Sequence, residues 1–154
     1  MEKCKHFLPG FRTTCIIVSV LFIFLAGSLF SRGLMTSMAE FKVPHEQLNS
    51  PHFYNAISWV YLHMIVIGLI IGVAGLYAEG ERFKLAFSWL MFLANAVYTY
   101  LDFVHSDSVL GNGLYKGNAS VFPAIISLAV TLLFLHLGIC AASRKIKNPR
   151  TQQD

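Results

Sequence analysis

Four long apolar stretches, separated by short polar segments, make up most of the 154-residue chain. They cover residues 13–31, 56–78, 85–104 and 119–142 and lack the in-and-out alternation of β-strands. A helix needs about 20 residues to cross the roughly 30 Å hydrocarbon core of a bilayer, and each stretch satisfies this requirement. The pattern predicts an all-α protein with one membrane-embedded domain over residues 1–154, an antiparallel bundle of four transmembrane helices.

The composition supports a membrane protein over a soluble globular one. Hydrophobic residues make up 55% of the chain and charged residues 13%, and the mean hydropathy is +0.58. The net charge of +4 fits contact with anionic lipid headgroups, and nothing in the sequence indicates nucleic-acid binding. The lipid bilayer is therefore the first predicted partner.

Basic residues lie mainly at one side of the predicted bundle. That side carries the amino-terminal tail, the turn between the second and third stretches, and the carboxyl tail, with Lys3, Lys5, Arg12, Arg82, Lys84, Arg144, Lys145, Lys147 and Arg150. The opposite side carries Arg32, Lys42 and Lys116. Because cytoplasmic loops are enriched in Lys and Arg, both termini are predicted to face the cytoplasm of a multi-pass protein in the cytoplasmic or inner membrane. Phe24 occupies a position where cleavage after Ala26 would need a small residue, which favours an uncleaved first helix.

The third stretch contains polar groups that hydrocarbon penalises, in the segment FLANAVYTYLDFVHSD of residues 92–107. Asn95, Tyr98, Asp102 and His105 are spaced by three, four and three, so a helix places them within an arc of roughly 80°. Such a face cannot look at lipid, because each unsatisfied polar group costs several kcal/mol there. It must look into the bundle, a cavity or another subunit.

The second stretch carries a matching stripe at helical spacing: His52, Ala56, Trp59 and His63. The short turn between the second and third stretches predicts that they are antiparallel neighbours, with His63 and Asn95 both roughly 12 to 15 Å below the outer surface. We therefore expect one site, formed by His63, Asn95 and Tyr98 with Trp59 above them.

Less specific interpretations remain open for most of these residues. Asn95 can be an interhelical hydrogen-bonding group, and Asp102 and His105 can be solvated residues near the interface. His63 is ionisable and lies near the midplane, and its neutral form can ligate a metal or haem, which favours a functional role. His136 is expected to be interfacial or buried, and the three cysteines, Cys4, Cys15 and Cys140, to be structural thiols. No HExxH, CxxC or GxSxG motif is present.

Several short motifs are similar to a known family. The first outer loop contains Glu40-Phe41-Lys42-Val43-Pro44, the short turn after the second stretch is Leu76-Tyr77-Ala78-Glu79, and the third stretch has Asn95 followed by Tyr98 and Tyr100. These features resemble styrene oxide isomerase, a four-helix membrane protein of similar length. The resemblance implies haem b bound between the subunits of a homotrimer through a histidine of the second helix. It also implies rearrangement of a small apolar epoxide to an aldehyde, with ferric iron as the Lewis acid and an asparagine and a tyrosine that orient the substrate.

The chain departs from this family at the site itself. The register places Asn55 at the haem-ligand position, Tyr61 at the asparagine and Thr99 at the tyrosine. His52 and His63 bracket the ligand position, so one of them ligates the iron, or only the fold is kept.

The deeper residue, His63, is our expected iron ligand, with His52 as the second choice. Trp59 is expected to contact the cofactor, and Tyr98 and Asn95 to be the catalytic groups. Three functions remain open: a haem-dependent isomerase, a haem- or quinone-binding module without isomerase activity, and a structural membrane subunit.

Overall fold

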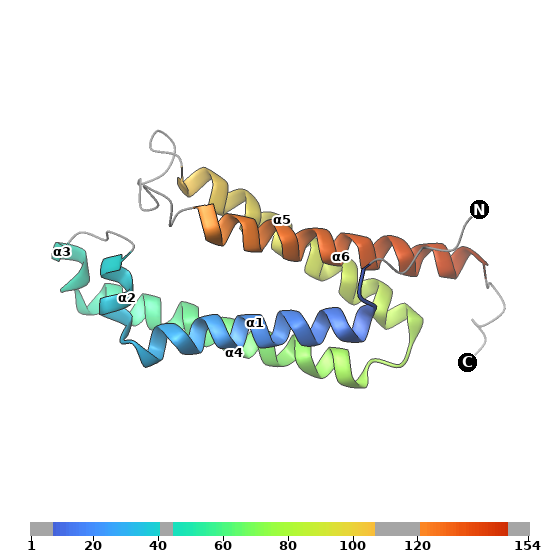
Figure 1. Ribbon diagram of the computed structural model, residues 1–154, viewed down its shortest axis with the longest axis horizontal. Helices are drawn as coiled ribbons and strands as arrows, with labels where there is room; N and C mark the ends of the chain where they lie inside the picture. Colours follow the sequence, from blue (N-terminus) through green and yellow to red (C-terminus); the bar gives the residue numbers. More distant parts are fainter. Residues whose placement is uncertain (1–7, 41–44, 107–120, 148–154) are drawn as a thin grey trace.

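The computed structural model describes residues 8–40, 45–106 and 121–147, and every regular element in these ranges is a helix (Figure 1). The elements are α1 (Phe11–Ser31), α2 (Leu34–Glu40), α3 (His45–Leu48), α4 (Pro51–Tyr77), α5 (Glu81–Ser106) and α6 (Val121–Lys147). By length and hydropathy, α1, α4, α5 and α6 can each cross a membrane. The expected all-α class with four membrane-length helices is confirmed.

The helix α4 begins five residues earlier than the apolar pattern predicts. The side chain of Ser50 accepts a hydrogen bond from the Phe53 backbone N–H at 3.5 Å and caps the first turn. Pro51 occupies the first helical position, where its missing N–H removes no helical hydrogen bond. In the sequence, Pro44 and Pro51 of the first outer loop indicate a segment without a long helix, because proline breaks a helix interior. This expectation is wrong for Pro51, which starts α4, and Pro44 lies outside the described residues.

A sharp corner joins α1 to the short helix α2. Gly33 adopts a φ of 85°, a left-handed conformation that residues with a Cβ rarely adopt, and its N–H donates to the Phe30 carbonyl at 3.1 Å. The corner turns α2 back against the bundle, where Leu34 and Met38 are buried. The segment after α1 was expected to be a loop, but within its described part it contains two short helices.

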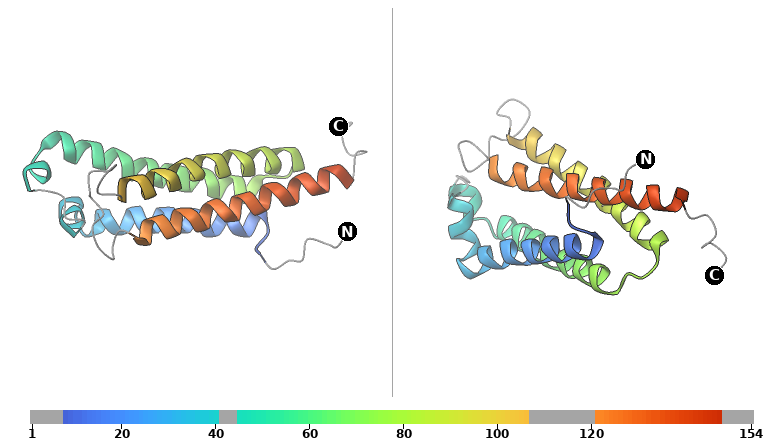
Figure 2. Two further views of the ribbon diagram at one scale, coloured as in Figure 1. Left: turned by 90° about the horizontal axis from the view of Figure 1, so that it is seen from above. Right: turned by 45° about the vertical axis from the view of Figure 1, so that its right-hand side comes forward.

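The four long helices form two pairs, α1 with α4 and α5 with α6 (Figures 1 and 2). In each pair the two helices run in opposite directions, and the pairs spread apart toward the end where α2 and α3 lie. The expectation that α4 and α5 pack side by side along their length is wrong within one copy of the chain. A short connection after Tyr77 joins them, but each packs mainly on a different helix.

Close approach of α1 and α4 depends on small residues of α4. A Cβ added at Gly75 would lie 2.6 Å from the Cys15 Cβ and 3.3 Å from the Arg12 carbonyl oxygen. A Cβ at Gly72 would lie 2.7 Å from the Ser19 hydroxyl, and one at Gly68 would also contact α1. The GLIIG spacing seen in the sequence therefore brings two backbones together, as small residues four apart do in membrane helices.

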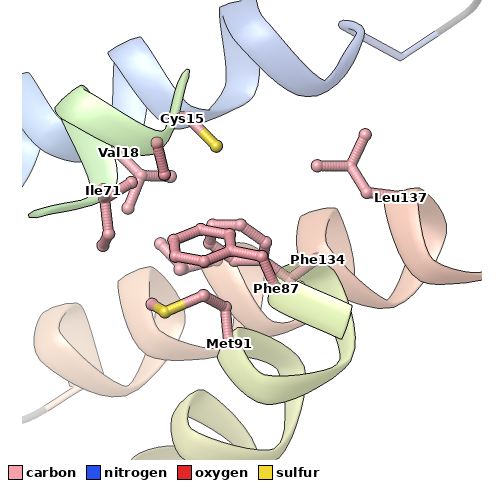
Figure 3. Packing of buried hydrophobic residues seen from close by; sticks show 9 residues of the cluster. Cys15, Val18, Ile71, Phe87, Met91, Phe134 and Leu137 are labelled. Atoms are coloured by element: carbon pink, nitrogen blue, oxygen red, sulfur yellow. The ribbon is translucent and has the colours of Figure 1, made fainter. Parts of the chain in front are cut away.

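One apolar cluster connects the two pairs (Figure 3). Its buried members are Cys15, Val18, Ile71, Ala74, Phe87, Met91, Val130, Phe134 and Leu137, so all four long helices contribute. The rings of Phe87 and Phe134 lie edge to face, with centroids 6.4 Å apart, and Phe134 is fully buried. Dispersion contacts in this cluster hold α5 and α6 against α1 and α4.

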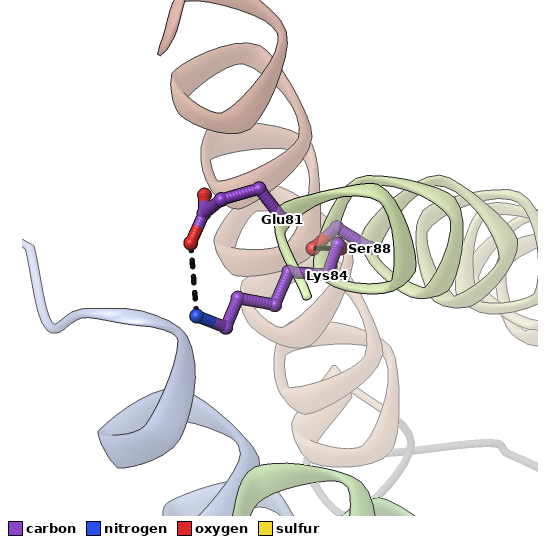
Figure 4. Close-up of polar contacts among 3 residues, drawn as sticks. All are labelled: Glu81, Lys84 and Ser88. Atoms are coloured by element: carbon purple, nitrogen blue, oxygen red, sulfur yellow. Dashed lines mark hydrogen bonds and ion pairs between the residues drawn. The ribbon is translucent and has the colours of Figure 1, made fainter. Parts of the chain in front are cut away.

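The first turn of α5 is fixed by local polar contacts (Figure 4). Lys84 Nζ lies 2.9 Å from Glu81 Oε1, and the buried Ser88 hydroxyl donates to the Lys84 carbonyl at 2.7 Å. The negative Glu81 also lies where the helix dipole favours an anion. These contacts stabilise the amino-terminal end of α5, which follows directly after the short connection from α4.

The close α1–α4 contact predicts that substitution of glycine by alanine destabilises the protein at Gly75 but not at Gly27. Gly75→Ala should lower the free energy of unfolding by about 1 to 3 kcal/mol, because the new methyl group overlaps Cys15. Gly27→Ala is the matched control: its added Cβ meets no atom within 4 Å, and alanine has the higher helix propensity, so stability should stay equal or rise. SDS titration of both variants in mixed micelles measures this, and equal stability of the two would contradict the close contact.

Candidate functional site

The side chain of His63 has a defined orientation on α4. Its Nδ1 lies 2.7 Å from the backbone carbonyl oxygen of Trp59, one turn earlier in the same helix. A carbonyl oxygen can only accept, so Nδ1 carries the proton and donates it. The neutral ring therefore has its lone pair on Nε2, on the side of the ring away from this carbonyl. Ligating histidines commonly have this arrangement, with one nitrogen bonded to a carbonyl and the other free for a metal.

His63 is exposed near the middle of α4. It lies roughly 18 Å from Pro51 along the helix axis, at about 1.5 Å per residue, in a helix of 27 residues. Its side chain is exposed on the surface of the single chain and does not point into the core between the two helix pairs. An exposed imidazole at this depth faces lipid unless another molecule covers it.

Trp59 forms the other half of this surface. Its ring centroid is 5.6 Å from that of His63, the two planes are tilted by 44°, and the side chain is 57% exposed. Together the two rings present an aromatic and imidazole surface on one side of α4. His52, the second-choice ligand, is exposed in the first turn of the same helix, nearer the end of the span.

Asn95 and Tyr98 of α5 do not share one environment. Asn95 is buried, and its Nδ2 donates to the Met91 carbonyl at 2.7 Å within the same helix. Tyr98 is 52% exposed. Although the two residues are only three apart in the sequence, the side chain of Asn95 is packed inside the protein and that of Tyr98 points outward.

The expected four-residue site is not assembled within one copy of the chain. His63 and Trp59 lie together on the exposed side of α4, a helix that packs on α1. Asn95 is buried on α5, a helix that packs on α6. The structure thus brings together the predicted cofactor-binding pair and leaves the predicted catalytic residues on the other helix pair.

The polar face of α5 packs against α6. The hydroxyls of Thr99 and Thr131 are 2.9 Å apart, and both residues are buried. Thr131 donates its proton to the Ser127 carbonyl at 2.8 Å, so Thr99 must be the donor to Thr131. One turn further along α5, Ser127 donates to Asp102 Oδ2 at 2.5 Å. Of the predicted stripe, Asn95 is buried and Asp102 bonds across to α6, as expected for a face that avoids lipid, whereas Tyr98 is exposed in the single chain. The side chain of His105 lies outside the described ones.

From the sequence alone, Ser127 and Thr131 can both bond backbone carbonyls of their own helix, and nothing singles out Thr99 as a structural residue. Thr131 does bond its own helix, whereas Ser127 bonds the carboxylate across the interface. The helical spacing of Thr99 with Asp102, and of Ser127 with Thr131, could have predicted these two contacts. That prediction would have required knowing first that α5 and α6 pack together.

Metal-ligating side chains are sparse in the part of the chain that the structure describes. No group of three or more His, Cys, Asp or Glu side chains there could hold a metal ion. A metal ligated wholly by this chain therefore has no support among those residues. A cofactor that needs one protein ligand fits His63, whose Nε2 is available.

Comparison with known proteins assigns this chain to no family. No family model, no curated protein and no solved structure matches it.

The hydrogen bond between Thr99 and Thr131 predicts a measurable coupling between α5 and α6. In a double-mutant cycle of Thr99→Val and Thr131→Val, the coupling energy should be about 0.6 to 1.7 kcal/mol, as for other hydrogen bonds inside membrane bundles. Ser88→Ala is the control partner, because Ser88 bonds only the Lys84 carbonyl of its own helix. It should combine additively with Thr99→Val in SDS titrations. Additivity of the two threonine substitutions would show that the cross-helix bond contributes nothing.

Proposed function

We propose that this protein is an integral membrane, haem-dependent isomerase-like enzyme that rearranges a small hydrophobic epoxide to a carbonyl compound. One observation supports it above the others: His63 donates from Nδ1 to the Trp59 carbonyl and leaves Nε2 available on an exposed surface near the middle of the span. Together with the resemblance to styrene oxide isomerase, this makes His63 the residue that we propose would hold haem b.

The side chains around His63 fit a flat cofactor with one protein ligand. Haem would need only one histidine from the protein to hold it. The exposed Trp59 ring, 5.6 Å from the imidazole, offers an apolar aromatic surface for the macrocycle. When bound, the ferric iron would supply Lewis-acid polarisation of the epoxide oxygen without a proton donor.

A second copy of the chain completes the proposed site. An exposed imidazole in the hydrocarbon region is costly, so the α4 surface of His63 and Trp59 is expected to be covered in the membrane. A homo-oligomer, a trimer by the resemblance, would cover it and exclude water from the epoxide. A face of α5 with the exposed Tyr98 is available to meet α4 of a neighbouring copy.

The positions of the α5 residues distinguish their proposed roles. The phenol of Tyr98 is exposed and able to contact a substrate held by the neighbouring copy. Asn95 is buried and its Nδ2 is bonded to Met91, so it is proposed to fix the packing of α5 behind Tyr98. The burial of Asn95 also favours a second candidate, a haem- or quinone-binding module without isomerase activity, because it leaves Tyr98 as the one expected catalytic group that is exposed.

The proposed orientation places both termini in the cytoplasm of a cytoplasmic or inner membrane. The start of α1, the α4–α5 connection and the end of α6 lie at the same end of the molecule (Figure 1), and the basic residues of the sequence gather in these segments. A periplasmically activated phosphatase should be inactive when fused to the carboxyl terminus and active when fused after Lys116. The reverse result would invert the topology.

Absorption spectroscopy of the detergent-purified protein tests haem binding. The wild-type protein should show a Soret band, His63→Ala should lose it, and His52→Ala, a matched histidine on the same helix, should keep it. All three should elute alike in gel filtration, so that loss of haem is not loss of fold. A wild-type protein with no Soret band after haem reconstitution would contradict the proposal, and loss only in His52→Ala would move the ligand to His52.

Turnover of an aryl epoxide to its aldehyde separates the isomerase from the binding module. The haem-loaded protein should convert the epoxide, and Tyr98→Phe should reduce kcat at least about 10-fold, since removal of one hydrogen-bond donor from an active site costs on the order of 10² or more. Tyr100→Phe is the control, because Tyr100 is also exposed but, two residues further along α5, points to a different side of the helix. Haem binding without any aldehyde product would favour the module.

A further inference from the structure

The α5–α6 interface carries a carboxylate inside one end of the membrane span. Asp102 lies two residues before Val104, where the apolar segment of α5 ends, and its side chain is half-buried. Ser127 of α6 donates its hydroxyl proton to Asp102 Oδ2 at 2.5 Å, a distance typical of a hydroxyl bonded to a charged oxygen. The two side chains therefore place a negative charge and a hydroxyl oxygen together between two helices.

Helix packing alone does not account for a charged group at this position. One turn deeper, the same two helices are joined by the buried hydroxyls of Thr99 and Thr131, 2.9 Å apart, and neither carries a charge. A carboxylate in an apolar span costs far more than a hydroxyl, and such groups are commonly paired with a cation. Among the described residues, the hydrogen bond from Ser127 is the one polar contact of Asp102, so its charge is not balanced by any of them.

We propose that Asp102 and Ser127 form a binding site for a monovalent cation, sodium, between α5 and α6. The Asp102 oxygens face the ion and balance its charge. Ser127 has two lone pairs and can turn its proton toward a backbone carbonyl of its own helix, so its oxygen serves as a further ligand. This site is separate from the surface of His63 and Trp59 on α4, and it does not depend on the function proposed for that surface.

The donor atoms determine the class of cation. All of them are oxygens, whereas soft metals prefer sulfur or nitrogen ligands. Calcium takes about six to eight oxygens, commonly from several carboxylates, and no group of three or more His, Cys, Asp or Glu in the described ranges could hold a metal ion. One carboxylate balances one positive charge. Two oxygens as close as those of Asp102 and Ser127 suit a small ion, which favours sodium over potassium.

The position of the pair gives an ion access from one side only. α5 continues four residues beyond Asp102 to Ser106, and Ser127 lies six residues after the start of α6 at Val121, so the site is roughly 6 to 9 Å below these helix ends. Water from that end of the span completes the shell of the ion. On the deeper side, the buried Thr99 and Thr131 fill the interface. This arrangement fits a site that binds an ion and does not conduct it.

Thermal unfolding of the full chain in dodecyl maltoside tests sodium binding. Circular dichroism follows the helices at pH 8, above the usual pKa of histidine, in sodium, potassium or choline chloride at one ionic strength. With sodium at about ten times its dissociation constant, the unfolding equilibrium constant should fall about 11-fold, which raises Tm by about 3 to 6 °C. We expect a saturable rise in sodium, a smaller rise in potassium and none in choline.

Three variants separate ion binding from helix packing. Asp102→Asn keeps an oxygen that accepts from Ser127 but removes the charge, so the sodium shift should be lost. Ser127→Ala removes one ligand and should raise the sodium concentration at half-maximal shift by about 10-fold or more, as for loss of a group bonded to a charge. Thr99→Val is the matched control: it breaks the neighbouring bond between the helices, so Tm should fall in every salt while the sodium shift stays.

Two results would overturn the proposal. One is an equal Tm of the wild-type protein in the three salts, which would leave the Asp102–Ser127 bond as a packing contact. The other is a sodium shift of wild-type size in both Asp102→Asn and Ser127→Ala, which would place the ion elsewhere.

Discussion

The hydrocarbon core of the bilayer contains no group that can accept or donate a hydrogen bond, and this constraint shapes the chain at every level. It requires that the backbone of each span be helical, as α1, α4, α5 and α6 are. It also requires that polar side chains in the spans find partners within the protein. Among the described residues, no buried side-chain nitrogen or oxygen lacks such a partner.

The same constraint separates His63 from the other polar residues of the spans. Asn95 Nδ2, the Thr99 hydroxyl and Asp102 Oδ2 each have a hydrogen-bond partner within α5 or across in α6. His63 satisfies one nitrogen only, and its ring lies at the surface in mid-span. An exposed imidazole in hydrocarbon is costly, and this cost is the physical basis of the proposal that a cofactor and a second copy cover it.

The sequence predicted the class of fold well and the neighbours of each helix poorly. Apolar length alone located four spans, because crossing a bilayer is a requirement on each helix separately. The choice of neighbour depends on the shapes of two surfaces. Gly75 fits against Cys15 and Thr99 meets Thr131, and no periodicity within one helix reveals such a match. The polar stripe of α5 was therefore recognised, but it was assigned to the wrong partner helix, and the site built on that assignment was divided between two helix pairs.

The division into an α1–α4 pair and an α5–α6 pair follows the order of the sequence, with one apolar cluster as the main contact between the halves. Each half is a helical hairpin whose contacts are complete within its own stretch of chain. The first hairpin can therefore leave the insertion machinery and become stable in the lipid while the ribosome is still translating the second. Assembly of the whole then needs a single late docking event at the apolar cluster. Loss of the Phe87 ring, which lies edge to face with Phe11 of α1 at 6.0 Å, would affect that event without preventing either hairpin from entering the membrane.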